Sequence, residues 1–151
     1  MAYVARVSQR IQVPIQVAFD CLADHAAWSS WMPSSFRPVG KSFRRLEEGI
    51  AFRARILGSL APATCHVTVL KSPAEITWCG GKKGILWAEH RFLFEPKGEG
   101  GVEVESVESW HGPLATLLRR LIEPAARKVG KDQLQALQAA ALRLHERATK
   151  T

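Results

Sequence analysis

The sequence predicts an α+β fold in which a curved antiparallel sheet of about six to seven strands wraps around one long C-terminal helix. Two observations support this. From Gly112 onward, apolar residues recur at steps of three and four, which is the period of one helix face. The segments before it are short and bounded by Gly and Pro, as antiparallel strands are. Because a long helix cannot bury an apolar stripe alone, we expect the stripe to lie on the sheet.

The first elements are a strand and two short helices. From Tyr3 to Val13, apolar residues of one parity alternate with polar residues of the other, as in a strand with one wet face. Pro14 then opens a short helix whose apolar face is formed by Ile15, Ala18, Phe19 and Leu22. Asp24 is placed to cap a second short helix, which carries Trp28 and Trp31.

Further strands follow, and no helical stretch separates them, so we expect antiparallel pairing. The expected strands are 36–44, which is weak, and 49–57, 63–71, 74–79, 85–95 and 101–111. The segment Gly80-Gly81-Lys82-Lys83-Gly84 superficially resembles a phosphate loop. It precedes a strand and lacks the Gly-x4-Gly-Lys-Ser/Thr spacing, so we interpret it as a mobile hairpin turn.

The final helix contains residues that interrupt helices. Pro113 suits the first turn, where its missing N–H costs nothing. Pro124 removes one hydrogen bond of the helix, and Gly130 loosens its middle. We therefore expect a kinked or two-part helix that starts at Leu114.

Length and charge limit the classes of function. The 151 residues fit a single domain, 1–151, with a sizeable core. The net charge of +7 suits an acidic ligand, an anionic membrane surface or RNA, although scattered basic clusters on a solvated surface are the more common explanation. The Lys and Arg clusters are not interleaved with aromatic residues, so we do not expect a nucleic-acid partner.

The cysteines and the hydropathy pattern concern compartment and cofactors. Three cysteines, odd in number and widely spaced, predict neither a disulfide scaffold nor a zinc site. No apolar run is long enough to span a bilayer, and the first residues do not form a signal peptide. We therefore expect a cytoplasmic protein with reduced thiols, no transmembrane segment, no metal and no cofactor.

Several motifs stand in a familiar order. They are 13–24 followed by Trp28 and Trp31, then His90-Arg91-Phe92 with Glu95-Pro96, and Glu108-Ser109-Trp110-His111-Gly112 before the last helix. In this order the chain resembles the helix-grip fold of the START and birch-pollen-allergen (SRPBCC) superfamily, and more closely its polyketide cyclase/dehydratase-like branch. The resemblance covers nearly the whole chain. It implies a hydrophobic cavity between helix and sheet that holds a lipid, polyketide, sterol or similar ligand.

Alternation along the strands places four polar side chains on the inward face, namely His66, His90, Ser106 and Glu108. Such residues are unfavourable in a core that holds no ligand, because an unpaired buried polar group costs roughly 1–3 kcal/mol. A few polar groups in an apolar wall are typical of ligand pockets. The expected ligand-binding residues are Phe52, His66, Trp78, His90, Phe92, Ser106, Glu108 and Trp110, with Trp28 and Trp31 at the cavity mouth. For the aromatic residues, plain core packing is the alternative.

His90 and Glu108 are also the candidate catalytic residues. They lie on consecutive strands of a predicted hairpin and on the same face, so they are candidates for cross-strand neighbours. Such a pair can hydrogen-bond a ligand or transfer protons. The alternatives are a structural pair that only fixes the hairpin, or a bulge that turns one side chain to solvent.

Three functions follow from these observations. The first is a binding or transport protein for a hydrophobic small molecule, with transient contact to an anionic membrane surface through its basic rims. The second is a cyclase or dehydratase-type enzyme that uses His90 and Glu108 as an acid–base pair. The third, which we rank lowest, is a basic interaction module for RNA, a ribosome or another anionic partner.

Overall fold

A computed structural model describes residues 3–150 and contains one seven-stranded antiparallel sheet, in the order β1-β7-β6-β5-β4-β3-β2. Its strands and helices, in chain order, are β1 (Tyr3–Ile11), α1 (Ile15–Ala23), the 3₁₀ turn η1 (His25–Ala27), α2 (Trp28–Trp31), β2 (Phe36–Val39), β3 (Ala51–Ile56), β4 (Ala63–Lys71), β5 (Glu75–Lys82), β6 (Leu86–Lys97), β7 (Gly101–His111), α3 (Pro113–Leu117) and α4 (Arg119–Thr149). The predicted α+β helix-grip architecture is confirmed.

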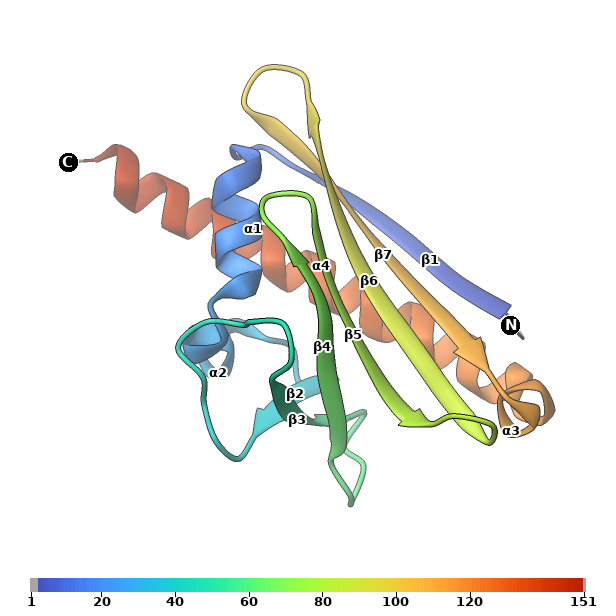
Figure 1. The fold of residues 1–151 in the computed structure, drawn as a ribbon. Coiled ribbons are helices and arrows are strands. Elements are labelled where there is room, and N and C mark those ends of the chain that lie inside the picture. Colours follow the sequence, from blue (N-terminus) through green and yellow to red (C-terminus); the bar gives the residue numbers. More distant parts are fainter. Residues whose placement is uncertain (1–2, 151) are drawn as a thin grey trace.

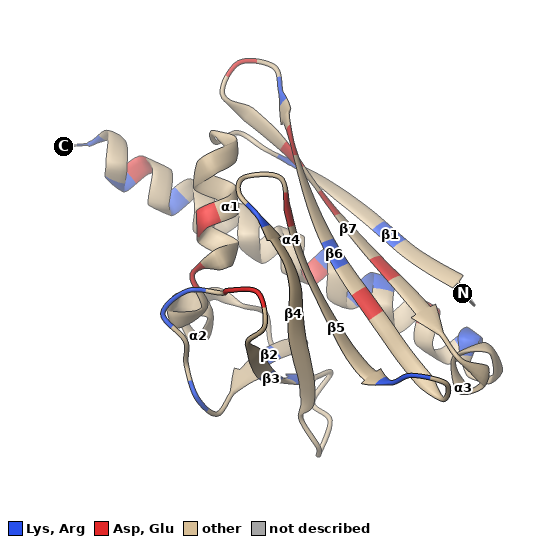
Figure 2. Cartoon of the chain, viewed as in Figure 1, with Lys and Arg blue, Asp and Glu red and all other residues tan. Residues whose placement is uncertain are grey.

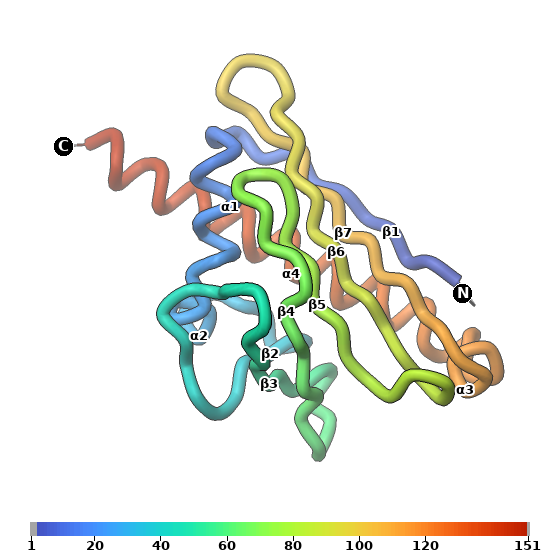
Figure 3. The backbone as a smooth tube through the Cα atoms, in the orientation of Figure 1, coloured from blue at the N-terminus to red at the C-terminus, as the bar shows by residue number. Residues whose placement is uncertain are grey.

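The sheet curls around α4. Figures 1 and 3 show α4 running behind the strands, from α3 at one end to the C-terminus at the other. It packs on β1 and β7 and also contacts α1. No helix within residues 3–150 is long and apolar enough to cross a membrane.

The C-terminal helix is in two parts, as predicted, but it divides at a different residue. The break lies at Leu118, between α3 and α4, and Pro124 sits inside α4. Pro124 falls in the second turn of α4, so the one hydrogen bond that it removes is the one its N–H would have donated to the carbonyl oxygen of Arg120. Pro113 takes the first helical position, one residue earlier than expected.

Gly130 has a different role from the flexibility that we expected. It is buried where α4 crosses the sheet, and a Cβ atom built there would lie 3.0 Å from Ser106 Oγ and 3.1 Å from Val7 Cγ2. The absence of a side chain therefore lets α4 approach β7 and β1 closely. This contact fixes the helix against one side of the sheet.

The turn between β5 and β6 is tighter than predicted. β5 continues through Gly80 and Gly81 to Lys82, which pairs with Leu86. Gly81 has a φ of 94°, and a Cβ there would clash with the carbonyl oxygen of Leu86. Only glycine fits this position, so the glycines shape the end of the hairpin and its narrow spacing.

Aromatic side chains fill the part of the interior beside α1 and α2. Trp28, Phe36, Phe52 and Trp78 pack together with ring centroids 5.1–6.4 Å apart. Phe19 and Phe94 form a further edge-to-face pair at 5.3 Å. This cluster fills the interior beside α1 and α2 and leaves a space under the first half of α4.

Candidate functional site

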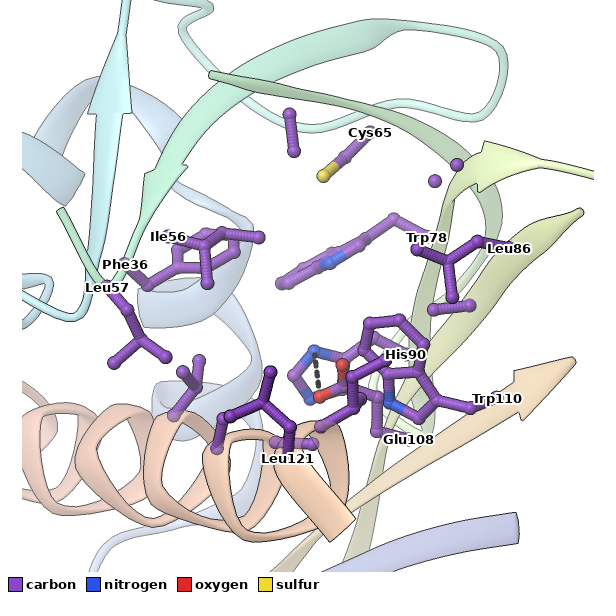
Figure 4. Close-up of a pocket in the computed structure, with 18 residues that line it drawn as sticks. Phe36, Ile56, Leu57, Cys65, Trp78, Leu86, His90, Glu108, Trp110 and Leu121 are labelled. Carbon is purple, nitrogen blue, oxygen red and sulfur yellow. Dashed lines mark ion pairs between the residues drawn. The ribbon is translucent and has the colours of Figure 1, made fainter. Parts of the chain in front are cut away.

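A cavity of about 370 Å³ lies between the first half of α4 and the curved sheet (Figure 4). Its wall is almost entirely apolar, and none of its lining residues is Lys or Arg. The lining residues are Phe36, Ile56, Leu57, Ala63, Cys65, Trp78, Gly80, Gly81, Leu86, Ala88, His90, Glu108, Trp110, Leu121, Ile122, Ala125, Ala126 and Val129.

The β6–β7 pairing brings the two candidate catalytic residues together. His90 stands directly opposite Glu108 in the antiparallel register, so the expected cross-strand neighbours are confirmed. His90 Nδ1 lies 3.8 Å from Glu108 Oε2, and the two side chains are only 7% and 13% exposed. The other ring nitrogen, Nε2, is 2.7 Å from Ser106 Oγ and hydrogen-bonds to it. Ser106 therefore holds the imidazole in place from behind.

Burial governs the charge of this pair. Removal from water lowers the pKa of His90 to about 3, because it disfavours the protonated ring. The same effect raises the pKa of Glu108 to about 8. The nearby indole N–H of Trp110 opposes the rise, although Nε1 makes no hydrogen bond of normal geometry. Near neutral pH the site thus holds a neutral imidazole beside a mostly protonated carboxyl, not an ion pair.

Two aromatic rings hold His90. Phe92 stacks on the imidazole with centroids 4.3 Å apart, and Trp78 meets it edge-on at 5.3 Å. Trp78 also packs against Phe36 and Phe52, so it forms the boundary between the filled half of the interior and the cavity. This apolar enclosure is the physical reason why His90 stays neutral.

The structure brings four of the expected ligand-binding residues to the cavity wall, namely Trp78, His90, Glu108 and Trp110. Ser106 and Phe92 support His90 from positions outside the lining. Phe52 is fully buried in the aromatic cluster and is therefore part of the core, not of the cavity wall.

The expected position of the two helix tryptophans at the cavity mouth is wrong. Trp28 is completely buried, and its indole N–H donates to the carbonyl oxygen of Leu22 at 2.9 Å. Trp31 is half-buried against the same core. Because α2 is covered by the aromatic cluster, its tryptophans seal the closed half of the interior.

The expected inward orientation of His66 is also wrong, since its side chain is exposed and its neighbours Cys65 and Val67 are buried. A β-bulge between Val67 and Val69 is the cause. The extra residue shifts the parity, so alternation counted from Leu70 points to the wrong face before the bulge. His66 therefore lies outside the candidate site, and Cys65 takes the inward place.

Sequence reasoning did not select several residues of the wall. Leu121, Ile122, Ala125 and Val129 belong to the apolar stripe of the last helix, which was seen but not assigned to a site. Cys65 was detectable only by allowing for the bulge. Gly80 and Gly81 carry no side chain, so alternation cannot detect them.

Metal binding finds no support in the part of the chain that the structure describes. No three or more His, Cys, Asp or Glu side chains within residues 3–150 are grouped as metal ligands would be. The three cysteines are buried free thiols, and burial raises the pKa of Cys65 in the cavity wall to about 12. Cys65 is thus a neutral, apolar part of the wall.

Comparison with known proteins gives one family and one fold. The model of a family described as polyketide cyclase / dehydrase and lipid transport matches residues 4–145. No curated protein matches the chain.

Solved structures of similar fold include a hypothetical protein from Helicobacter pylori, with 18% identity, a TM-score of 0.72 and coverage of 93% of this chain and 89% of that one. A protein from Mesorhizobium loti has 13% identity, a TM-score of 0.72 and coverage of 93% and 98%. A START superfamily protein from Mycobacterium smegmatis has 13% identity, a TM-score of 0.68 and coverage of 93% and 98%. At these identities the likeness shows the fold.

Proposed function

The chain belongs to the polyketide cyclase/dehydrase and lipid transport family, whose members are expected to bind hydrophobic ligands, and from this premise we propose that it sequesters or carries a compact apolar molecule. The membership confirms the resemblance to the SRPBCC superfamily. We place the ligand in the cavity between α4 and the sheet.

The apolar cavity is the observation that carries this proposal. Its volume of about 370 Å³ lies near the lower end of the range of about 300–1,000 Å³ that is usual for ligand pockets. A wall with few polar groups favours an apolar ligand, and the volume favours one compact molecule over a lipid with two long chains.

Binding of N-phenyl-1-naphthylamine, a neutral apolar fluorescent probe, tests the proposal. We expect the wild type to bind it, and we expect Ala88→Trp and Ala125→Trp, which fill the cavity from opposite walls, to lose binding. Ala51→Trp, on the exposed face of β3, is the matched control and should bind as the wild type does. Folding of each variant is checked by circular dichroism. A wild type that binds no apolar probe, or filled variants that bind normally, would refute a ligand cavity.

An enzyme is the second candidate, since the cavity contains a carboxyl that is protonated near neutral pH. The pKa of Glu108, about 8, suits a general acid, because such groups work best near the operating pH. The pKa of His90, about 3, makes it a weak base at that pH and a better positioning group. If turnover of a polyketide-like substrate is unchanged in a His90→Ala, Glu108→Ala double variant, this candidate is removed.

We also propose that the cavity mouth contacts an anionic membrane surface transiently. Leu57 and Leu121 line the cavity yet are 46% and 71% exposed, so they form its rim. Two pairs of basic residues adjoin lining residues in the sequence: Lys82 and Lys83 follow Gly81, and Arg119 and Arg120 precede Leu121. Figure 2 shows basic residues at the β5–β6 turn and around the start of α4. Apolar side chains beside cations are the combination that an anionic bilayer attracts.

Sedimentation with vesicles tests this contact. The wild type should bind phosphatidylglycerol vesicles more strongly than phosphatidylcholine vesicles, and added salt should weaken the binding. A Leu57→Ser, Leu121→Ser variant removes the two exposed apolar side chains of the rim and should bind less. Leu144→Ser, near the other end of α4, is the control. Equal binding to both vesicle types, or none, would contradict the contact.

A further inference from the structure

The polar groups of the cavity gather at one end of it. Glu108 and Trp110 lie two residues apart on β7, on the same face, and His90 faces Glu108 from β6. Figure 4 shows the three side chains together beside α4, with the rest of the wall formed by apolar groups. The apolar remainder of the cavity can therefore bind a ligand only by packing against it, whereas this end can form hydrogen bonds with it.

Not every hydrogen-bonding group at this end has a partner in the protein. His90 Nε2 is engaged by Ser106. The distance from His90 Nδ1 to Glu108 Oε2, 3.8 Å, exceeds that of a hydrogen bond. Trp110 Nε1 is buried near the Glu108 carboxyl, and among the described residues it makes no hydrogen bond of normal geometry. An indole N–H can only donate, so Trp110 Nε1 is available to donate to an acceptor on a ligand.

Glu108 adds a second donor. No Lys or Arg lines the cavity, and an isolated buried carboxylate is very costly, so the carboxyl is kept as the neutral acid with its O–H. The titratable groups that face it are Tyr3 on β1, Cys65 on β4 and His90 on β6, whereas α4 contributes only apolar side chains to the cavity. None of these neighbours provides a positive charge near neutral pH. Tyr3 and Cys65 are neutral there, because burial raises their pKa values, and His90 is neutral because burial lowers its pKa.

Resting on the proposed ligand cavity, we propose that the site selects apolar molecules whose polar group is an uncharged hydrogen-bond acceptor, such as a ketone or ester carbonyl. The O–H of Glu108 and the N–H of Trp110 bind that oxygen. A hydrocarbon of the same shape leaves both donors unpaired, and a site built to hydrogen-bond its ligand rejects such an analogue. A cationic ligand would require an ionised carboxyl, which the enclosure disfavours.

Three probes with one carbon skeleton test the selection, with binding followed by calorimetry. They are 2-acetylnaphthalene, which carries the acceptor, 2-ethylnaphthalene, which lacks it, and 1-(2-naphthyl)ethylamine, which is cationic. At about pH 6, where Glu108 is protonated, we expect the ketone to bind roughly tenfold more tightly than the hydrocarbon, as one hydrogen bond allows. The amine should bind most weakly.

Raising the pH tests the role of the carboxyl. At about pH 9.5, above the pKa of Glu108 near 8, the preference for the ketone should fall severalfold as the O–H donor is lost. Glu108→Gln retains a donor that does not titrate, so it should prefer the ketone at both pH values. Glu108→Leu removes one of the two donors and leaves that of Trp110, so it should prefer the ketone less than the wild type does at about pH 6, while its hydrocarbon binding reports an intact cavity.

The outcomes distinguish a failure of this inference from a failure of the proposed function. If no probe binds the wild type, both fail. If all three bind with equal affinity, or the amine binds best at about pH 6, the cavity stands and the selection for an acceptor is refuted. If Glu108→Leu does not fold, the wild type is compared with Glu108→Gln. A preference for the ketone that falls with pH in the wild type and not in Glu108→Gln supports the role of the Glu108 O–H, and the same pH dependence in both proteins refutes it.

Discussion

Replacing Glu108 by Gln should stabilise the folded protein, and the gain should grow with pH. Burial raises the pKa of Glu108 from 4.5 to about 8 in the folded state. Between these two values the folded protein keeps a proton that the unfolded chain has released, so the free energy of unfolding decreases as the pH rises. Gln has nearly the same shape and no such proton, and it therefore avoids the loss.

The size of the effect follows from the two pKa values. Each unit of difference in pKa is worth about 1.36 kcal/mol, so the gain from Glu108→Gln is about 3 kcal/mol at pH 7. It reaches a limit on the order of 5 kcal/mol above the folded-state pKa of about 8.

His90 makes the free energy of unfolding depend on pH in the opposite direction. Burial lowers its pKa from 6.5 to about 3, so its neutral form costs stability as the pH falls through that window. Between pH 4.5 and 6.5 the folded state holds one proton on Glu108, and the unfolded state holds one on His90. These two residues alone therefore give the wild type a stability plateau in that window and a decline on either side.

Urea denaturation of wild type and Glu108→Gln at several pH values from about 5 to 8 measures this difference. Glu95→Gln is the control on the neighbouring strand, because the Glu95 side chain is 73% exposed and its loss should change little. A Glu108→Gln protein that is less stable than the wild type at pH 7 would refute the reasoning, since it would show an ionised Glu108 paired with a protonated His90.

Three further predictions concern packing around the site. Gly130→Val should lower the free energy of unfolding by about 1–3 kcal/mol, because its side chain would crowd Ser106 and Val7, and an unchanged urea midpoint would show that α4 can move away. Ser106→Ala leaves His90 Nε2 unpaired and should cost about 1–3 kcal/mol in the same assay, whereas Ser30→Ala, on the exposed side of α2, should cost less. The thiol of Cys65, with a pKa of about 12, should react with a disulfide reagent only after unfolding, and rapid reaction in the native protein would contradict its place in a closed wall.

The sequence allowed the architecture and the central pair of the site to be predicted, because strict alternation survives along β6 and β7. Counting by twos from Phe92 to His90 and from Ser106 to Glu108 reaches the inward face in both strands, and the short turn between them sets the register. Local patterns were sufficient there because each strand is regular over its full length.

The same method failed where geometry departs from a fixed period. One bulge in β4 moved His66 outward and Cys65 inward. The position of Trp28 depended on which rings fill the interior, and that is decided by packing among α2, β2, β3 and β5, not by the period of any one of them. Gly130 is likewise required because α4 lies close to β7 and β1, and the sequence pattern of α4 alone does not reveal that distance.

The place of β1 has a consequence for how the protein is made. Within residues 3–150, β1 is an edge strand with β7 as its only neighbour in the sheet, and its inner face is covered by α4. β1 leaves the ribosome before residues 101–111, so it must wait for them before it can pair, and for α4 before its apolar side is shielded. Such long-range closure makes folding slow and late. A nascent chain that stalls before Gly101 would carry an unpaired β1 edge and an uncovered sheet, which is the form most exposed to proteolysis and aggregation.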